Sequence, residues 1–299
     1  MWPFLSDIVS TEIVALIFDF DDTLAPDSTT KLLKNSGIDT NKFWQSARTL
    51  VEQGYDQPSA YLKLILDNVG EDKALGSLTN AKLREFGASL DSDFYPGLPQ
   101  FFDEIYEDVR SSYKNIHIEF YIVSGGLYEV VAGSAIVRKY FKGIYGCHLA
   151  GETEGGALKF VKRSITFTEK TRFIYEIHKG LDPRETARNP AMVNKFIPQE
   201  KRRIPLSNMI YVGDGLTDIP CFSLLKSNGG LGFGVFDPKQ EKKAKTALEE
   251  FLQTDRVISM HAPNYEKDAD LGAILRAAVA NRCTAIQLHR EQPRREPNR

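Results

Sequence analysis

Three aspartates stand within four positions at the end of an apolar run. Asp19, Asp21 and Asp22 follow Ile13–Phe18, a segment with the length and composition of a buried strand. Like charges this close repel, and a divalent cation is the simplest way to offset them. Asp19 and Asp21 are two apart, so on an extended backbone both side chains point to one side. Such a pair suits a reaction in which one carboxylate attacks and the other moves protons. An acidic turn after a core strand is the simpler alternative.

A second acidic turn has the same layout. The apolar run Asn208–Val212 leads into Gly213–Asp218, and a helix is expected from about Ile219 to Lys226. The two glycines leave room for close backbone approach, and Asp214 and Asp218 lie four apart at the start of this helix.

Two further segments are suited to binding an anion. The predicted strand Ile116–Val123 ends in Ser124-Gly125-Gly126, and a helix follows from about Leu127 to Ser134. A hydroxyl and the N–H groups of a helix start would face one point there, although a tight turn that only needs glycine fits as well. Lys170 lies in the first turn of a helix for which Thr168 is the expected N-cap. A cation there opposes the helix dipole, which hints that it neutralises a group outside the helix; a solvated lysine is the alternative.

These residues require an α/β framework to bring them together. Other expected strands are Leu231–Phe236 and Arg256–Met260, and shorter β-like runs occur at Ile144–Gly146 and Ser164–Phe167. The other expected helices are Pro99–Ser111, Gln240–Gln253 and Asp268–Ala280. Ligands of a parallel α/β sheet bind beyond the carboxyl ends of its strands, so the acidic turns, Ser124 and Lys170 would converge. Hard carboxylate oxygens without His or Cys favour Mg²⁺ over zinc, and the set could hold Mg²⁺ with a phosphoryl group.

A stretch between the first two predicted strands has a different character. Residues 27–94, here called the helical insertion, show helical periodicity and no convincing strand. Its expected helices are Lys31–Ser36, a second from Thr40 or Asn41 to Gly54, a third from Pro58 to Gly70, and Thr79–Leu90. We therefore predict a core formed by residues 1–26 and 95–265, interrupted by this insertion. Residues 181–206 read as a polar surface insertion, with a short helix around Ala191–Phe196. Residues 266–299 should hold the last helix and a disordered basic tail from Arg290 to Arg299.

Composition and charge narrow the functional classes. The formal net charge of −2 over 299 residues gives no general attraction to nucleic acid or to a membrane surface. No apolar run approaches the ~20 residues that a membrane span needs, and the first residues lack the basic region of a signal peptide. Cys147, Cys221 and Cys283 are too few and too far apart for a disulfide framework, so we expect buried thiols and a cytoplasmic location. The oligomeric state is not predicted.

These motifs resemble those of the haloacid dehalogenase-like (HAD) hydrolase superfamily, in its phosphoserine-phosphatase-type branch. The first motif matches Asp19–Leu24, the second Ser124 with its glycines, the third Lys170, and the fourth Gly213–Asp218. Their order agrees with the superfamily, and the helical insertion lies where one type of cap is found. The resemblance implies a three-layer Rossmann-like core with a mainly parallel sheet, plus an all-helical cap. For the third motif, Lys159 and Lys162 are nearby competitors.

The resemblance also implies a role for each matched residue. Asp19 would attack phosphorus to give an aspartyl-phosphate, and Asp21 would act as general acid and then as general base. Mg²⁺ would be held by the Asp19 carboxylate, the Asp21 backbone carbonyl and Asp214, with Asp218 directly or through water. Ser124, Gly125 and Lys170 would bind the phosphoryl oxygens. The implied activity is hydrolysis of a small soluble phosphorylated metabolite.

The chain departs from the family pattern at two places. Asp22 stands where the superfamily often has Gly or Ser, so it is either a solvated loop residue or a residue that retunes the site. Phosphoserine-specific enzymes place a Glu soon after the first motif to read the substrate ammonium, whereas this chain has Ser28 with Asp27 beside it. Arg48 and Arg84 of the helical insertion could meet an acidic substrate, but surface positions are the expected reading.

Other activities remain compatible with parts of the pattern. A phosphotransferase would pass the phosphoryl group to an acceptor hydroxyl, and a phospho-accepting signalling module also surrounds Mg²⁺ with acids, a hydroxyl and a lysine. A halide-displacing enzyme would leave Asp21 and the second acidic turn without a function. A scaffold without activity is the least expected, because every matched catalytic position is present.

Overall fold

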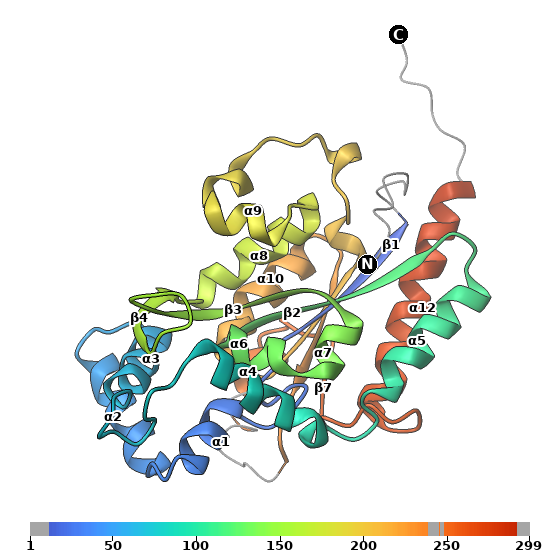
Figure 1. Cartoon of the computed structure of the whole chain (residues 1–299). Helices are drawn as coiled ribbons and strands as arrows, with labels where there is room; N and C mark the ends of the chain where they lie inside the picture. The colour runs from blue at the N-terminus through green and yellow to red at the C-terminus, as the bar shows by residue number, and fades with distance from the viewer. Residues whose placement is uncertain (1–11, 239–244, 246–247, 292–299) are drawn as a thin grey trace.

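The computed structural model describes residues 12–238, 245 and 248–291. Its centre is a seven-stranded sheet in the order β4-β3-β2-β1-β5-β6-β7 (Figure 1). The strands are β1 Ile13–Phe18, β2 His117–Leu127, β3 Phe141–Gly151, β4 Leu158–Arg163, β5 Met209–Gly213, β6 Leu231–Val235 and β7 Ser259–His261. Neighbouring strands are parallel except β3 and β4, so the predicted mainly parallel α/β sheet is confirmed.

The strand order reverses at β1, and this determines where a site can form. β1 pairs with β2 on one side and with β5 on the other, while the later strands continue outward in both directions. Crossover helices leave a crevice beyond the carboxyl ends of the strands at such a switch point. The carboxyl ends of β1, β2 and β5, which carry the predicted motifs, therefore lie side by side at this switch point.

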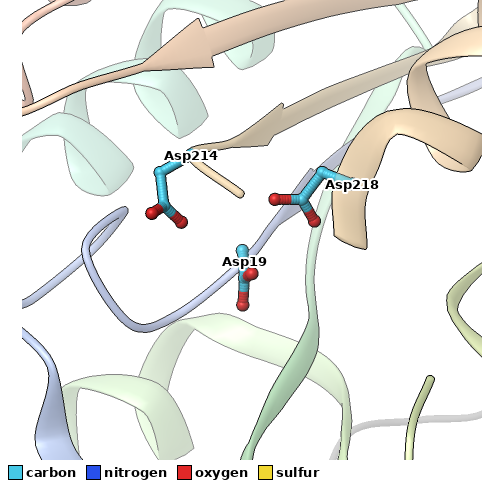
Figure 2. Close-up of side chains that lie close together, drawn as sticks. All are labelled: Asp19, Asp214 and Asp218. Atoms are coloured by element: carbon cyan, nitrogen blue, oxygen red, sulfur yellow. The ribbon is translucent and has the colours of Figure 1, made fainter. Parts of the chain in front are cut away.

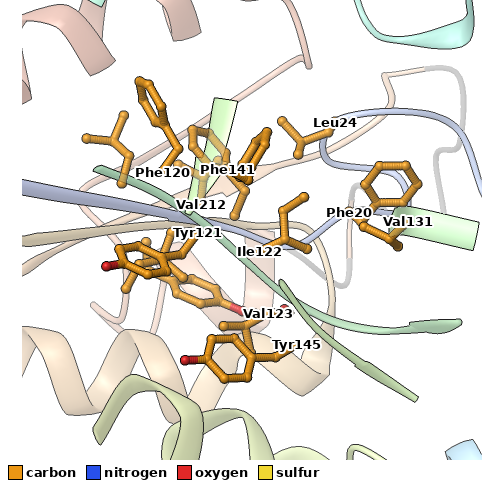
Figure 3. Close-up of a cluster of buried hydrophobic side chains, with 14 of the residues drawn as sticks. Phe20, Leu24, Phe120, Tyr121, Ile122, Val123, Val131, Phe141, Tyr145 and Val212 are labelled. Carbon is orange, nitrogen blue, oxygen red and sulfur yellow. Dashed lines mark hydrogen bonds between the residues drawn. The ribbon is translucent and has the colours of Figure 1, made fainter. Parts of the chain in front are cut away.

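Helices cover both faces of the sheet, and this confirms the predicted three layers. On one face lie α5 Gln100–Ser112 and α12 Asp270–Glu291, side by side in Figure 1, and on the other lie α8 Phe167–Lys179 and α10 Ile219–Ser227. The alternation of side chains along each strand fills both layers. In Figure 3, Phe120 and Phe141 lie on one side of the strands, and Tyr121 and Tyr145 on the other. The short helices are α6 Tyr128–Gly133, α7 Ala135–Tyr140 and α9 Pro183–Arg188.

The helical insertion contains the predicted helices and is closely packed on the core. They are α1 Ser28–Asn35, α2 Thr40–Glu52, α3 Gln57–Asp67 and α4 Asn80–Ala88, followed by the 3₁₀ turn Ser89–Asp93. Helix α4 crosses α6 at two glycines: a Cβ on Gly87 would lie 1.9 Å from the carbonyl oxygen of Val130, and one on Gly133 would lie 2.2 Å from that of Arg84. Only glycine permits this approach, so α4 is fixed against the core.

Several local predictions were wrong where tertiary contacts decide the structure. Ser164–Phe167 is not a strand; the chain turns there into α8, whose N-cap is Thr166 and not Thr168. The backbone N–H of buried Ile165 donates to the sulfur of Cys147 instead of to a strand partner. In the polar segment 181–206 the α-helix is α9, and the expected helix near Ala191 is the 3₁₀ turn Pro190–Asn194.

The last helix is longer than the sequence indicated. Helix α12 continues past Ala280 to Glu291, because Cys283 and Ile286 are buried and Arg290 donates to the carbonyl oxygens of Lys114 and Asn115. Most of the predicted tail, residues 292–299, and residues 240–244 and 246–247 of the predicted helix Gln240–Gln253 lie outside the described residues. Leu248–Leu252 forms a π-helical turn. None of the helices within the described ranges is both long and apolar enough to cross a membrane.

Candidate active site

The first acidic turn follows β1 directly. The backbone N–H of Asp19 donates to the carbonyl oxygen of Val212 at 2.9 Å, which extends the pairing of β1 with β5 by one residue. The carbonyl oxygen of Phe20 then accepts from the N–H groups of Thr23, Leu24 and Ala25, so the chain reverses tightly. Asp22 takes a left-handed backbone conformation with φ 55°, which aspartate tolerates better than most residues and glycine adopts at no steric cost. This conformation explains why a glycine suits the same position.

Three carboxylates from the two acidic turns meet beyond the ends of β1 and β5. One oxygen of each of Asp19, Asp214 and Asp218 lies within 4.8 Å of the others, and Figure 2 shows the three side chains close together. We call these three residues the carboxylate cluster. The predicted convergence of residues 19 and 214, almost two hundred positions apart, is thus present in the fold.

Lys170 lies between two members of the carboxylate cluster. Its Nζ is 2.6 Å from Oδ2 of Asp19 and 2.7 Å from Oδ1 of Asp218, and the side chain is fully buried in α8. Burial alone would lower the pKa of Lys170, but the two carboxylates raise it, so the ammonium stays charged. The competing lysines lie elsewhere: Lys159 pairs with Glu152 at the surface, and Lys162 is exposed. The structure therefore brings Lys170, and neither competitor, to Asp19.

The single ammonium group of Lys170 does not offset the negative charge of the carboxylate cluster. Desolvation and the charges of Asp19 and Asp218 raise the pKa of Asp214 well above its usual range, and Lys170 offsets only part of this. The donor atoms facing one another are hard carboxylate oxygens, which suit a divalent cation such as Mg²⁺. The chemistry of the site therefore fits the predicted metal. The side chain of Asp21 is not in this group.

Asp218 is held by three donors. Its Oδ1 accepts from Lys170 and from the hydroxyl of Tyr211 at 2.7 Å, and its Oδ2 accepts from the N–H of Gly215 at 2.9 Å. Tyr211 is fully buried in β5, three residues before Asp214. Tyr211 is not among the residues that the motifs indicated. The sequence feature that could have indicated Tyr211 is a tyrosine inside an otherwise apolar strand. A buried hydroxyl needs a hydrogen-bond partner, so such a tyrosine is expected to contact a polar group.

Asp21 is oriented separately, toward the helical insertion. Its Oδ1 accepts from the N–H of Ser28 at 2.7 Å, at the start of α1. Burial and the nearby charge of Asp27 raise the pKa of Asp21 to about 8, although the hydrogen bond from Ser28 opposes the shift. Asp21 can therefore hold a proton at neutral pH. Its Oδ2 lies against Gly126, where a Cβ would be only 2.5 Å away.

Ser124 and its glycines lie beside Asp21 in the last part of β2, which continues to Leu127 with an irregular pairing to β3, so the prediction that the strand ends before Ser124 is wrong. Ser124 is buried, and its Oγ accepts from the N–H of Gly126 at 3.0 Å. This N–H is therefore used within the irregular end of β2 and is not directed outward, contrary to the predicted anion nest. The hydroxyl hydrogen of Ser124 remains for another acceptor. The carbonyl oxygen of Gly125 accepts from the hydroxyl of Tyr61 and from the thiol of Cys147, two contacts that the sequence did not indicate.

The other residues considered from the sequence lie outside this group. Arg48 is exposed on α2, and Arg84 of α4 forms an ion pair with Glu129 of α6. Cys147, Cys221 and Cys283 are buried free thiols, as expected.

Comparisons with known proteins identify a sequence relative and a shared fold. No protein-family model matches the chain. An uncharacterized protein of Borreliella burgdorferi is 31% identical over an alignment of 237 residues that covers 72% of this chain and 79% of the relative. A solved phospho-aspartyl intermediate analogue of phosphoserine phosphatase has a TM-score of 0.50 and 16% identity, covering 89% of this chain and 99% of that chain. A HAD family hydrolase from Salmonella enterica serovar Typhi has a TM-score of 0.49 and 17% identity, covering 79% of this chain and 66% of that chain.

Proposed function

We propose that this chain, which belongs to one family with the Borreliella protein and has the haloacid dehalogenase-like fold, is a Mg²⁺-dependent phosphomonoester phosphatase. Its substrate would be a small phosphorylated metabolite, and the reaction would pass through an aspartyl-phosphate on Asp19. The main support is the convergence of Asp19 with Lys170 and Asp214, while Asp21 stands apart with a raised pKa. The nucleophile and the proton donor thus have different environments, as acid and base in one site require.

The proposed first step uses Asp19 and Asp21 together. A carboxylate oxygen of Asp19 attacks phosphorus, and the bond from phosphorus to the leaving oxygen breaks as that oxygen takes the proton of Asp21. In the second step the Asp21 carboxylate takes a proton from a water molecule, which attacks the aspartyl-phosphate at phosphorus. Inorganic phosphate leaves, Asp19 is free again, and Asp21 has regained its proton.

The remaining residues would bind the phosphoryl group and balance charge. The Lys170 ammonium and the free hydrogen of Ser124 can each donate to a phosphoryl oxygen, with Gly125 beside Ser124. The Asp19 carboxylate, the Asp21 carbonyl and Asp214 would hold Mg²⁺, with Asp218 directly or through water. When bound, the ion would neutralise charge so that a carboxylate can approach a phosphate of the same sign.

We further propose that the helical insertion, residues 27–94, acts as a cap over a core of residues 1–26 and 95–265, with residues 266–299 as a C-terminal segment whose helix α12 covers one face of that core. Two contacts support this: the N–H of Ser28 holds Asp21, and Tyr61 reaches the segment after Ser124. A cap in this place would exclude water and contact the leaving group. Buried free thiols support a reducing, cytoplasmic location.

Hydrolysis of a generic aryl phosphate tests the proposal. The wild type should require Mg²⁺, and Asp19→Asn should lose activity by at least about 10³-fold, because the nucleophile is gone. Asp67→Asn, at an exposed ion pair with Lys63, is the matched control and should leave turnover unchanged. Mg²⁺-dependent turnover by Asp19→Asn at the wild-type rate would overturn the nucleophile assignment. Product diverted to added alcohols would indicate a phosphotransferase, and a long-lived phospho-Asp19 would indicate a signalling module.

A further inference from the structure

Tyr61 connects the helical insertion to the core beside the site. It lies on α3, its ring packs near Trp44 with a centroid separation of 6.0 Å, and only 9% of the residue is exposed. Its hydroxyl donates to the carbonyl oxygen of Gly125, which lies at the end of β2 and 64 positions away. A residue of the insertion thus contacts the backbone of the segment that carries Ser124.

The peptide that accepts this hydrogen bond also orients Ser124. The carbonyl of Gly125 and the N–H of Gly126 belong to one planar peptide unit, so fixing the oxygen also fixes the direction of the N–H. That N–H donates to Oγ of Ser124 at 3.0 Å. With one lone pair of Oγ engaged, the hydroxyl hydrogen is left to point toward a phosphoryl oxygen. Cys147 is a second, weaker donor to the same carbonyl, at 3.2 Å.

The same peptide lies beside the candidate general acid. Oδ2 of Asp21 is against Gly126, and Oδ1 of Asp21 accepts from Ser28 at the start of α1. Helices α1 and α3 therefore reach neighbouring parts of the site. Between them, the indole N–H of Trp44 donates to the hydroxyl of Thr30 at 2.7 Å, which ties α2 to α1.

We propose that Tyr61 is a positioning residue through which the seated helical insertion aligns the Gly125–Gly126 peptide, and with it the Ser124 hydroxyl, for binding of a phosphoryl group. The inference rests on the proposed function, since it assigns Ser124 to the phosphate. Burial raises the pKa of Tyr61 well above its usual range, so the phenol remains a donor at every working pH.

Tyr61→Phe tests this, because it removes the donor and keeps the ring against Trp44. In Mg²⁺-dependent hydrolysis of an aryl phosphate we expect kcat to fall about tenfold, and inhibition by inorganic phosphate to weaken by a similar factor. The melting temperature should change little. Tyr113→Phe is the matched control: its hydroxyl donates to the carbonyl of Ala280 at 3.4 Å, between α5 and α12, and its kinetics should equal those of the wild type.

A double-mutant cycle with Ser124→Ala distinguishes positioning from a merely structural effect. If Tyr61 acts through the serine, adding Tyr61→Phe to Ser124→Ala should cost less than about twofold in kcat. Additive losses, or a Tyr61→Phe enzyme with wild-type kcat and phosphate inhibition, would overturn the positioning role while the phosphatase assignment stands. A wild type that neither hydrolyses the ester nor binds phosphate would remove the proposed function and this inference with it.

Discussion

Two charged clusters, each built around buried carboxylates, lie near opposite ends of β2, and their carboxylates face different amounts of positive charge. At the amino end, Glu119 accepts from Arg203 through both oxygens, from Lys142 at 2.6 Å and from the hydroxyl of Tyr121 at 2.6 Å. We call these four residues the amino-end cluster. At the carboxyl end, the carboxylate cluster has three acids and Lys170.

The pKa values follow from this difference. Burial would raise the pKa of Glu119, but hydrogen bonds and charges from Arg203 and Lys142 lower it to about 2. The pKa of Asp214 moves the other way, because burial and the charges of Asp19 and Asp218 raise it and Lys170 offsets only part of the rise. A carboxylate whose charge is offset by cations of the protein has a structural role. A cluster with more carboxylates than protein cations is suited to binding a metal ion and a substrate. Substitutions in the two clusters should therefore have different effects on stability and on activity.

The largest effect is expected for Asp214→Asn. Activity should fall by about 10³-fold or more, because metal binding supports several kcal/mol of catalysis. The free energy of unfolding without Mg²⁺ should rise, since the change removes a disfavoured charge from the carboxylate cluster. Kinetics and urea unfolding in EDTA measure the two quantities. A loss of stability in EDTA would contradict the view that this cluster lacks positive charge.

Glu119→Gln should affect stability and not activity. The folded pKa of about 2 lies below the model-compound value of 4.5, so the ionised carboxylate stabilises the fold above about pH 4.5. This contribution, about 3 kcal/mol at pH 7, is lost as the pH falls toward 2. The variant resembles the protonated acid, so its deficit in unfolding free energy should be full at pH 7 and should shrink below pH 4.5. Turnover at pH 7 should change less than about twofold, and a deficit independent of pH would refute the linkage.

Added Mg²⁺ should stabilise the protein through the carboxylate cluster alone. At about 100 times the dissociation constant, a bound ion adds about 2.7 kcal/mol to the free energy of unfolding. Thermal unfolding with and without Mg²⁺ should show this gain in the wild type and in Glu119→Gln, but not in Asp214→Asn. An equal gain in all three proteins would locate the ion elsewhere.

The smallest effect is expected for Tyr211→Phe. The change removes one of three donors to Asp218 and leaves Lys170 and the N–H of Gly215 in place. A net cost of about 1 kcal/mol, or about fivefold in kcat, is expected if Tyr211 helps to orient Asp218. Tyr121→Phe at the amino-end cluster is the matched comparison, and should lower the unfolding free energy by a similar amount without changing kcat.

The amino acid sequence by itself determined the central strands β1, β2, β5 and β6, the helices of the insertion and the strand ends that carry the acidic turns, but not the edge strand β4. Apolar runs such as Ile13–Phe18 and turns such as Gly213–Asp218 depend on residues only a few positions apart, so a local pattern is enough to recognise them. The rule that parallel strands share a carboxyl end then predicted that Asp19 and Asp214 would meet.

Only the tertiary structure decided which side chains complete each cluster. Lys170 reaches Asp19 across 151 positions, and Arg203, from a segment without any periodicity, reaches Glu119 across 84. Lys159 and Lys162 have the same chemistry as Lys170, so residue type could not distinguish them. The fold distinguishes them by position. Helix α8 packs on the sheet at the switch point and places Lys170 between two carboxylates, which keep its ammonium charged. Strand β4 carries Lys159 and Lys162 at an edge of the sheet.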